Sequence, residues 1–169
     1  MQLLTYADFA NVSKDDDYYK PARWTYYSVV LQLLRQTTFN SALELGPYKM
    51  PLIIGSDTMD WSKELKPTYL HDAGTRPWPI ADNQYDMFLG LQVWEHLEGR
   101  QSEAFCELVR VARQAILSFP LNWNCPKDPI HHNISEDTIA EWTNHTAATS
   151  KIVVRTGERE RIVYQFDFR

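Results

Sequence analysis

The sequence predicts an α/β protein with a mostly parallel sheet, helices on both faces of the sheet, and an antiparallel hairpin at one edge. Short apolar segments bounded by glycine, proline and aspartate alternate with segments whose apolar residues recur every three or four positions. Such alternation is typical of parallel sheets covered by helices on both faces. The last two apolar segments, residues 151–155 and 161–168, flank a turn at Gly157, which predicts the hairpin.

The first predicted helix begins at Pro21, because proline suits the first turn of a helix, and it continues to residues 39–40. Its apolar stripe consists of Trp24, Tyr27, Val30, Leu31, Leu33 and Leu34. Residues 1–20 precede this helix and are rich in tyrosine and aspartate. We interpret them as a lid or a packed arm, with the acidic run at 15–17 forming a solvated turn.

Strands and helices then follow in order along the chain. The first strand is predicted at residues 41–46, where a Gly-Pro pair stops it. The remaining predicted strands are 52–55 or 56–61, then 68–72, 85–92 and 115–119. One helix is expected over residues 101–113, and a second runs from a Ser135 cap to Trp142.

The connection after the first strand is too short for an ordinary crossover helix. Parallel crossovers take about ten to twelve residues or more, whereas only about five remain before a strand at 52–55 and about nine before one at 56–61. Pro47 and Pro51 also remove two amide donors from this stretch. We favour the strand at 56–61 and predict no full helix before it. The helix from Pro21, or a partner subunit, would then cover the open face.

Composition and charge narrow the function classes. The chain has 169 residues, of which 44% are hydrophobic and 23% charged, so we expect one globular domain spanning 1–169. The formal net charge of −5 argues against a nucleic-acid partner, because nucleic-acid affinity depends on clustered lysine and arginine. The longest apolar runs are too short for a membrane span, and the first residues do not resemble a signal peptide. The two cysteines cannot build a disulfide framework, so a cytoplasmic location is expected.

Polar residues gather where the predicted strands end, and ligands of such sheets bind beyond these carboxyl ends. Glu44 and Gly46 close the first strand, and Gly46 allows a ligand to approach the backbone. Either Asp57 or Asp60 closes the second strand, where a carboxylate can accept both hydroxyls of a ribose. Asp72 closes the third strand and could accept a hydrogen bond from an exocyclic amine.

The middle of the chain resembles class I S-adenosylmethionine-dependent methyltransferases. The most specific match is the segment Leu70-His-Asp72-Ala73, followed by Pro77-Trp-Pro79, Tyr85-Asp86 and Glu95-His96-Leu97. It is similar to the family's aspartate-alanine motif, its P-F-P-D-x-S-F-D turn and its E-H-L ending. Residues 41–46 resemble the first motif, and 110–120 resemble a later helix and strand. The resemblance covers roughly residues 21–168, with His131 and His132 in a matching loop.

The resemblance implies a Rossmann-like three-layer sandwich. This sequence departs from the family pattern in its first crossover helix, which is shortened or missing. The resemblance also implies S-adenosylmethionine as cofactor, with Glu44 and Gly46 beside its methionine end. Asp60, or failing that Asp57, would bind the ribose, and Asp72 would accept from the adenine amine. Ala73 would supply a backbone donor to the cofactor. Gln92 and Val93 would line the side of the cofactor from which the methyl group is transferred.

The implied activity is methyl transfer to a small-molecule or sugar acceptor enclosed by the first helix, the N-terminal arm and residues 119–133. His96 is the candidate base for removing the acceptor's proton, with His131 as second choice. The alternative is a degenerate methyltransferase fold that acts as a binding or assembly partner.

We expect no metal, because His71, His131 and His132 lack the spacing of a metal hydrolase. A homodimer would follow if the shortened crossover exposes apolar surface.

Overall fold

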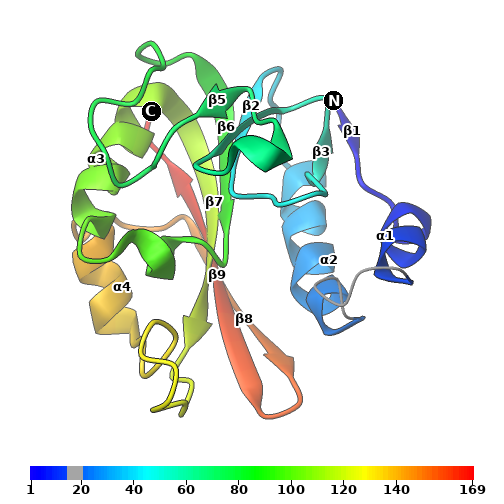
Figure 1. The fold of residues 1–169 in the computed structure, drawn as a ribbon, viewed down its shortest axis with the longest axis vertical. Coiled ribbons are helices and arrows are strands. Elements are labelled where there is room, and N and C mark those ends of the chain that lie inside the picture. The colour runs from blue at the N-terminus through cyan, green and yellow to red at the C-terminus, as the bar shows by residue number, and fades with distance from the viewer. Residues whose placement is uncertain (15–20) are drawn as a thin grey trace.

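The computed structural model describes residues 1–14 and 21–169, and a seven-stranded sheet runs through it (Figure 1). The strand order is β5-β4-β2-β6-β7-β9-β8, in which the first five are parallel and β9 is antiparallel to both of its neighbours. The strands are β2 (Ala42–Leu45), β4 (Asp57–Asp60), β5 (Tyr69–Leu70), β6 (Tyr85–Leu91), β7 (Ala112–Leu121), β8 (Ser150–Thr156) and β9 (Arg159–Asp167). The predicted sheet with its antiparallel hairpin is confirmed. The acidic run at 15–17 lies outside the described residues.

Helices cover both faces of the sheet, as predicted. Figure 1 shows α1 (Tyr6–Ser13) and α2 (Pro21–Arg35) on one side and α3 (Gln101–Val111) and α4 (Glu136–Trp142) on the other. Two short 3₁₀ helices, η2 (Lys63–Leu65) and η3 (Trp94–Leu97), lie in the connections after β4 and β6. None of the helices in the described part of the chain is long and apolar enough to span a bilayer.

Helix α2 ends several residues before the predicted end at 39–40. Its last turn tightens, because the amides of Gln36 and Thr37 donate to the carbonyls of Leu33 and Leu34. The Thr37 hydroxyl also donates to the Leu33 carbonyl at 2.9 Å. A β-branched residue whose hydroxyl competes for backbone carbonyls favours the end of a helix over its continuation.

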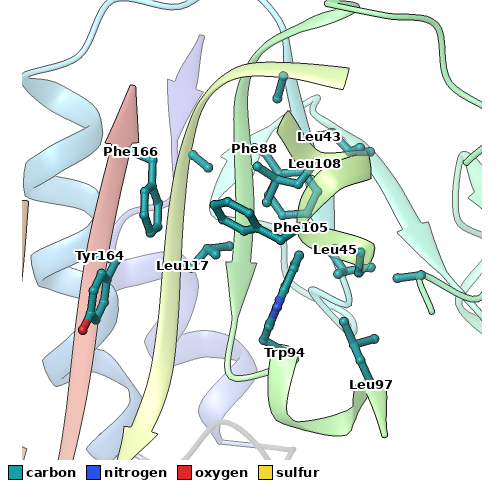
Figure 2. Close-up of a cluster of buried hydrophobic side chains, with 14 of the residues drawn as sticks. Leu43, Leu45, Phe88, Trp94, Leu97, Phe105, Leu108, Leu117, Tyr164 and Phe166 are labelled. Carbon is teal, nitrogen blue, oxygen red and sulfur yellow. The ribbon is translucent and has the colours of Figure 1, made fainter. Parts of the chain in front are cut away.

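Aromatic and leucine side chains pack together in the core between the sheet and α3 (Figure 2). The Phe88 ring packs 5.8 Å from Trp78 and 6.3 Å from Trp94, measured between ring centroids. Phe105 of α3 closes the cluster at 6.4 Å from Trp94. These rings come from β6, η3, α3 and one loop, so their packing fixes where the chain leaves the carboxyl end of β6.

Helix α2 covers the opposite face of the sheet. Its Tyr27 and Leu31 are buried in one cluster with Leu89 of β6 and Ile116 of β7. The part of the N-terminal arm that the structure describes is packed, since Phe9 of α1 lies 5.9 Å from the Tyr27 ring. Of the two alternatives that the sequence left open, the first helix is therefore seen to cover this face, and a homodimer stays a prediction.

The connection from β2 to β4 contains no helix, as predicted. Residues 46–56, all of them described, form turns and the two-residue strand β3 (Ile53–Ile54), which pairs antiparallel with β1 (Gln2–Leu3). β4 pairs in parallel with β2 through Leu43 and Asp57. The second strand of the parallel sheet is therefore within 56–61, and residues 52–55 belong to a separate ribbon.

Glu44 replaces the missing helix as the support of this connection. Side chains alternate along β2, so Leu43 and Leu45 enter the core under α3, while Ala42 packs under α2. Glu44 shares the face of Ala42, and its carboxylate accepts from the amides of Leu52 at 2.8 Å and Ile53 at 2.7 Å and from the Ser56 hydroxyl at 2.9 Å. These bonds commit its side chain to the crossover, and its expected place beside the cofactor's methionine end stays a prediction.

We predict that Glu44 makes the stability of the fold depend on pH. Burial raises the pKa of Glu44 from 4.5 to about 7, although the three hydrogen bonds lower it. The folded protein therefore binds a proton at Glu44 more tightly than the unfolded chain does. The stability that this proton adds to the fold is fully present below pH 4.5 and is lost as the pH rises to about 7. The free energy of unfolding should fall by up to about 3 kcal/mol across this range.

Urea unfolding at several pH values tests this prediction with Glu44→Gln, which stays neutral. The Glu44→Gln protein should lose that pH dependence. Glu103→Gln, an exposed change on α3, should keep it. Parallel pH profiles for wild type and Glu44→Gln would show that Glu44 does not titrate in this range.

Candidate functional site

A cleft of about 1070 Å³ opens at the carboxyl ends of β2, β4, β5 and β6. It is the place where the ends of parallel strands form a binding crevice. Every first-choice cofactor or catalytic residue except Glu44 lines it, whereas the second choices Asp57 and His131 do not. These lining residues are Gly46, Asp60, Asp72, Ala73, Gln92, Val93 and His96. Residues from four separate strand ends thus meet in one space, as the sequence predicts.

Gly46 sits where two strand ends come closest. Its φ of +58° is in the left-handed region, and a Cβ placed on it would lie 2.9 Å from Val93 Cγ2. Its amide donates to the Met59 carbonyl at 2.9 Å, which ties the start of the crossover to β4. Any larger residue would both strain the backbone and push Val93 away, so this floor of the cleft requires glycine.

The structure separates the two candidate carboxylates of β4. Asp60 is the last residue of the strand, lines the cleft and is 9% exposed. Its Oδ1 accepts from the Ser62 amide at 2.8 Å, which fixes the orientation of the carboxylate. Asp57 is the first residue of the strand, and its Oδ2 accepts from the Tyr85 hydroxyl at 2.6 Å. Asp60 is therefore the carboxylate at the cleft, and Asp57 belongs to the opposite end of the strand.

Asp72 is held by a turn and by an arginine that the sequence analysis did not identify. Its Oδ1 accepts from the Gly74 amide at 2.9 Å, and its Oδ2 accepts from Arg100 Nη1 at 2.8 Å. These bonds hold the pKa of Asp72 below its usual range. The Arg100 guanidinium packs on Gly74, where a Cβ would come within 2.3 Å of it. Arg100 precedes α3 and carries no local pattern that marks it as a site residue.

Gln92 contributes to the cleft mainly through its strained turn. Its φ is +54°, and its amide donates to the Ser118 carbonyl at 3.0 Å. Its side-chain amide donates to Ser118 Oγ at 3.2 Å, and its Oε1 accepts from Arg161 Nε at 3.1 Å. The side chain is thus tied to β7 and β9, and the turn carries Val93 to the floor of the cleft.

His96 and His131 lie together beyond the end of β6. Their ring centroids are 5.1 Å apart. The pKa of His96 is lowered below its usual value, mainly by burial and to a smaller extent by the neighbouring His131. His131 Nδ1 lies 2.8 Å from Asp128 Oδ2. Its ring also stacks on Trp123 at a centroid distance of 5.8 Å. The two candidate bases of the sequence analysis are therefore neighbours.

Glu95 precedes His96, and the sequence analysis named it only as part of the Glu95-His96-Leu97 motif, without a role. It is 4% exposed, and burial raises its pKa to about 8. Neither carboxylate oxygen has a hydrogen-bond partner in residues 1–14 and 21–169. His71 and His132 stay apart from this pair of histidines, since His71 Nε2 contacts the Thr75 carbonyl and His132 Nδ1 accepts from the Cys125 amide. The set expected of a metal hydrolase is therefore not assembled.

No protein-family model matches the chain, and no relative was found among curated proteins. Solved structures do match it. The N-methyltransferase NodS from Bradyrhizobium japonicum, in complex with S-adenosyl-L-homocysteine, gives a TM-score of 0.67 at 13% identity, covering 90% of this chain and 89% of that one. A SAM-dependent methyltransferase from Methanosarcina mazei gives a TM-score of 0.61 at 12% identity, covering 79% of this chain and 95% of that one.

An rRNA methylase from Escherichia coli also matches, with a TM-score of 0.58 at 17% identity, covering 95% of this chain and 74% of that one. The sheet order, the antiparallel hairpin and the cleft at the carboxyl edge agree with these similarities. The chain has the class I methyltransferase fold.

Proposed function

We propose that the protein binds S-adenosylmethionine in the cleft and transfers its methyl group to a small-molecule or sugar acceptor. The observation that carries this proposal is the meeting of Gly46, Asp60, Asp72 and Val93, from four strand ends, in one cleft. NodS and the other similar structures are methyltransferases, and the NodS structure contains the demethylated cofactor. The two free cysteines support the cytoplasm as its location.

Each cleft residue has a role that its position supports. Gly46 lets the methionine end of the cofactor approach the backbone, and Asp60 is placed to accept the ribose hydroxyls. Asp72 would accept from the adenine amine, with the Ala73 amide beside it. Gln92 and Val93 would face the methyl group.

The charge of the cleft also suits this cofactor. Four carboxylates line it in the described residues, at Asp60, Glu64, Asp72 and Glu98, against the two permanent cations Lys49 and Arg100. A net negative cleft attracts a sulfonium ion and binds its neutral thioether product less strongly. This difference favours product release after transfer.

Methyl transfer itself is an in-line displacement at a positive sulfur, so the protein mainly aligns donor and acceptor and excludes water. A hydroxyl or ammonium acceptor must also lose a proton. His96 lines the cleft three residues beyond Val93 and is placed to accept that proton. The residues before β2 and those around 119–133 would enclose the acceptor.

A second candidate function is a non-catalytic binding or assembly role. The crossover without a helix favours it, because the described residues 46–56 supply no helix amino end that could bind an anionic group. The two candidates differ in one measurable property. A catalytic protein must bind the cofactor, and a degenerate one need not.

We predict that S-adenosyl-L-homocysteine binds to one site per chain in a calorimetric titration. Asp72→Ala should weaken this binding about tenfold or more, because a hydrogen bond to a charged group contributes about 1.5–3 kcal/mol. Asp137→Ala, an exposed change in the first turn of α4, should leave the affinity unchanged. Absence of binding to the wild type would favour the non-catalytic role. Unchanged affinity in a folded Asp72→Ala protein would remove Asp72 from the site.

We predict that His96→Gln reduces turnover and spares cofactor binding. Loss of a general base typically costs about 10² to 10⁴ in rate. The rate at which S-adenosyl-L-homocysteine forms with hydroxyl acceptors measures turnover. The calorimetric titration described above measures cofactor affinity. His145→Gln, on an exposed turn after α4, is the matched control. A wild-type rate for His96→Gln would assign this histidine a structural role.

A further inference from the structure

Glu95, His96 and His131 form a compact cluster beside the cleft. One ligand atom from each of the three residues lies within 4.8 Å of the other two, and Glu95 Oε1 is 3.8 Å from His131 Nε2. Ligands of a tetrahedral ion with bonds of about 2.0–2.2 Å lie about 3.4 Å apart. A small side-chain adjustment therefore closes the cluster around one ion, and His96 is exposed enough to make it.

The Glu95 carboxylate gives the independent indication of a missing ligand. Its side chain is fully buried, with 0% exposure, and neither oxygen is hydrogen-bonded within the described residues. Buried polar groups are normally paired, and a buried charge without a partner is costly. Burial raises the pKa of Glu95, and its own backbone amide, Arg161 and Arg23 act against this rise.

His131 is oriented as a metal ligand would be. Its Nδ1 lies 2.8 Å from Asp128 Oδ2, so the proton belongs on Nδ1 and the lone pair on Nε2 points toward Glu95. A carboxylate that accepts the second imidazole proton is the usual support of a metal-bound histidine. Trp123 stacks on the same ring and restricts its rotation.

We propose that Glu95, His96 and His131 bind a divalent transition-metal ion at the acceptor side of the cleft. Two imidazoles and one carboxylate suit zinc, cobalt, iron or manganese better than calcium or magnesium. Three protein ligands leave positions open for water or substrate, as in catalytic metal sites. This site replaces the expectation that the protein binds no metal.

The chemical use of the ion rests on the proposed function. An acceptor oxygen bound at an open position would have its pKa lowered by the ion and would be held near the methyl donor. Imidazole bound to the ion through its lone pair does not act as a base. His96 would then act as a ligand in the metal-bound protein, and the ion would promote loss of the acceptor's proton.

Cobalt(II) titration of the chelator-treated full chain tests the site without any need for activity. Visible absorption and calorimetry should show one ion bound per chain. Glu95→Gln keeps the side-chain volume and should weaken binding at least tenfold, as should His131→Ala. Asp128→Asn should weaken it about tenfold or more through His131. His132→Gln is the matched control, because its ring turns to Cys125 in the same loop and should leave cobalt affinity unchanged.

Absence of cobalt binding at millimolar concentration would overturn the proposal, as would binding that Glu95→Gln leaves unchanged. If His131→Ala does not fold by circular dichroism, Glu95→Gln and Asp128→Asn still decide the outcome. Titration of the same samples with S-adenosyl-L-homocysteine separates the two proposals. Cofactor binding without cobalt binding refutes the metal site alone, and cobalt binding without cofactor binding refutes the proposed function alone.

Discussion

The three hydrogen bonds accepted by the Glu44 carboxylate are the contacts on which the carboxyl-end edge of the sheet depends. A crossover helix satisfies its amides internally, whereas a loop that crosses a sheet face must find acceptors elsewhere. Glu44 supplies them to Leu52, Ile53 and Ser56 from the centre of the sheet. The loop is thereby fixed in place, β3 can pair with β1, and Gly46 is held against Val93 at the floor of the cleft.

The order of the strands and helices was predictable because each boundary has a local cause. Pro21 begins α2, the Gly46-Pro47 pair stops β2, and Ser135 caps α4 through the Thr138 amide. The absent crossover helix followed from length and proline alone. The β1–β3 ribbon was not predictable, because two-residue strands have no usable periodicity and their partners lie some fifty residues apart.

The site was predictable in its carboxyl-end residues and not in its buried ones. Alternation along β2 places Glu44 on the face of Ala42, so the face of the sheet that it occupies could have been deduced from the parity of Leu43 and Leu45. The choice between Asp57 and Asp60 likewise depends on which end of β4 each occupies. Glu95 becomes buried when η3, the loop at 122–134 and β9 pack together. No local sequence pattern indicates this burial.

Helix α2 and the hairpin of β8 and β9 cover each other, although α2 is synthesised more than a hundred residues earlier. The hydroxyls of Thr25 and Thr156 lie 2.7 Å apart, and Val154 and Val163 share a buried cluster with the apolar stripe of α2. A nascent chain emerges with its N-terminal elements first. The part of the apolar stripe of α2 that packs on β8 and β9 therefore stays uncovered on the ribosome until these two strands have been translated.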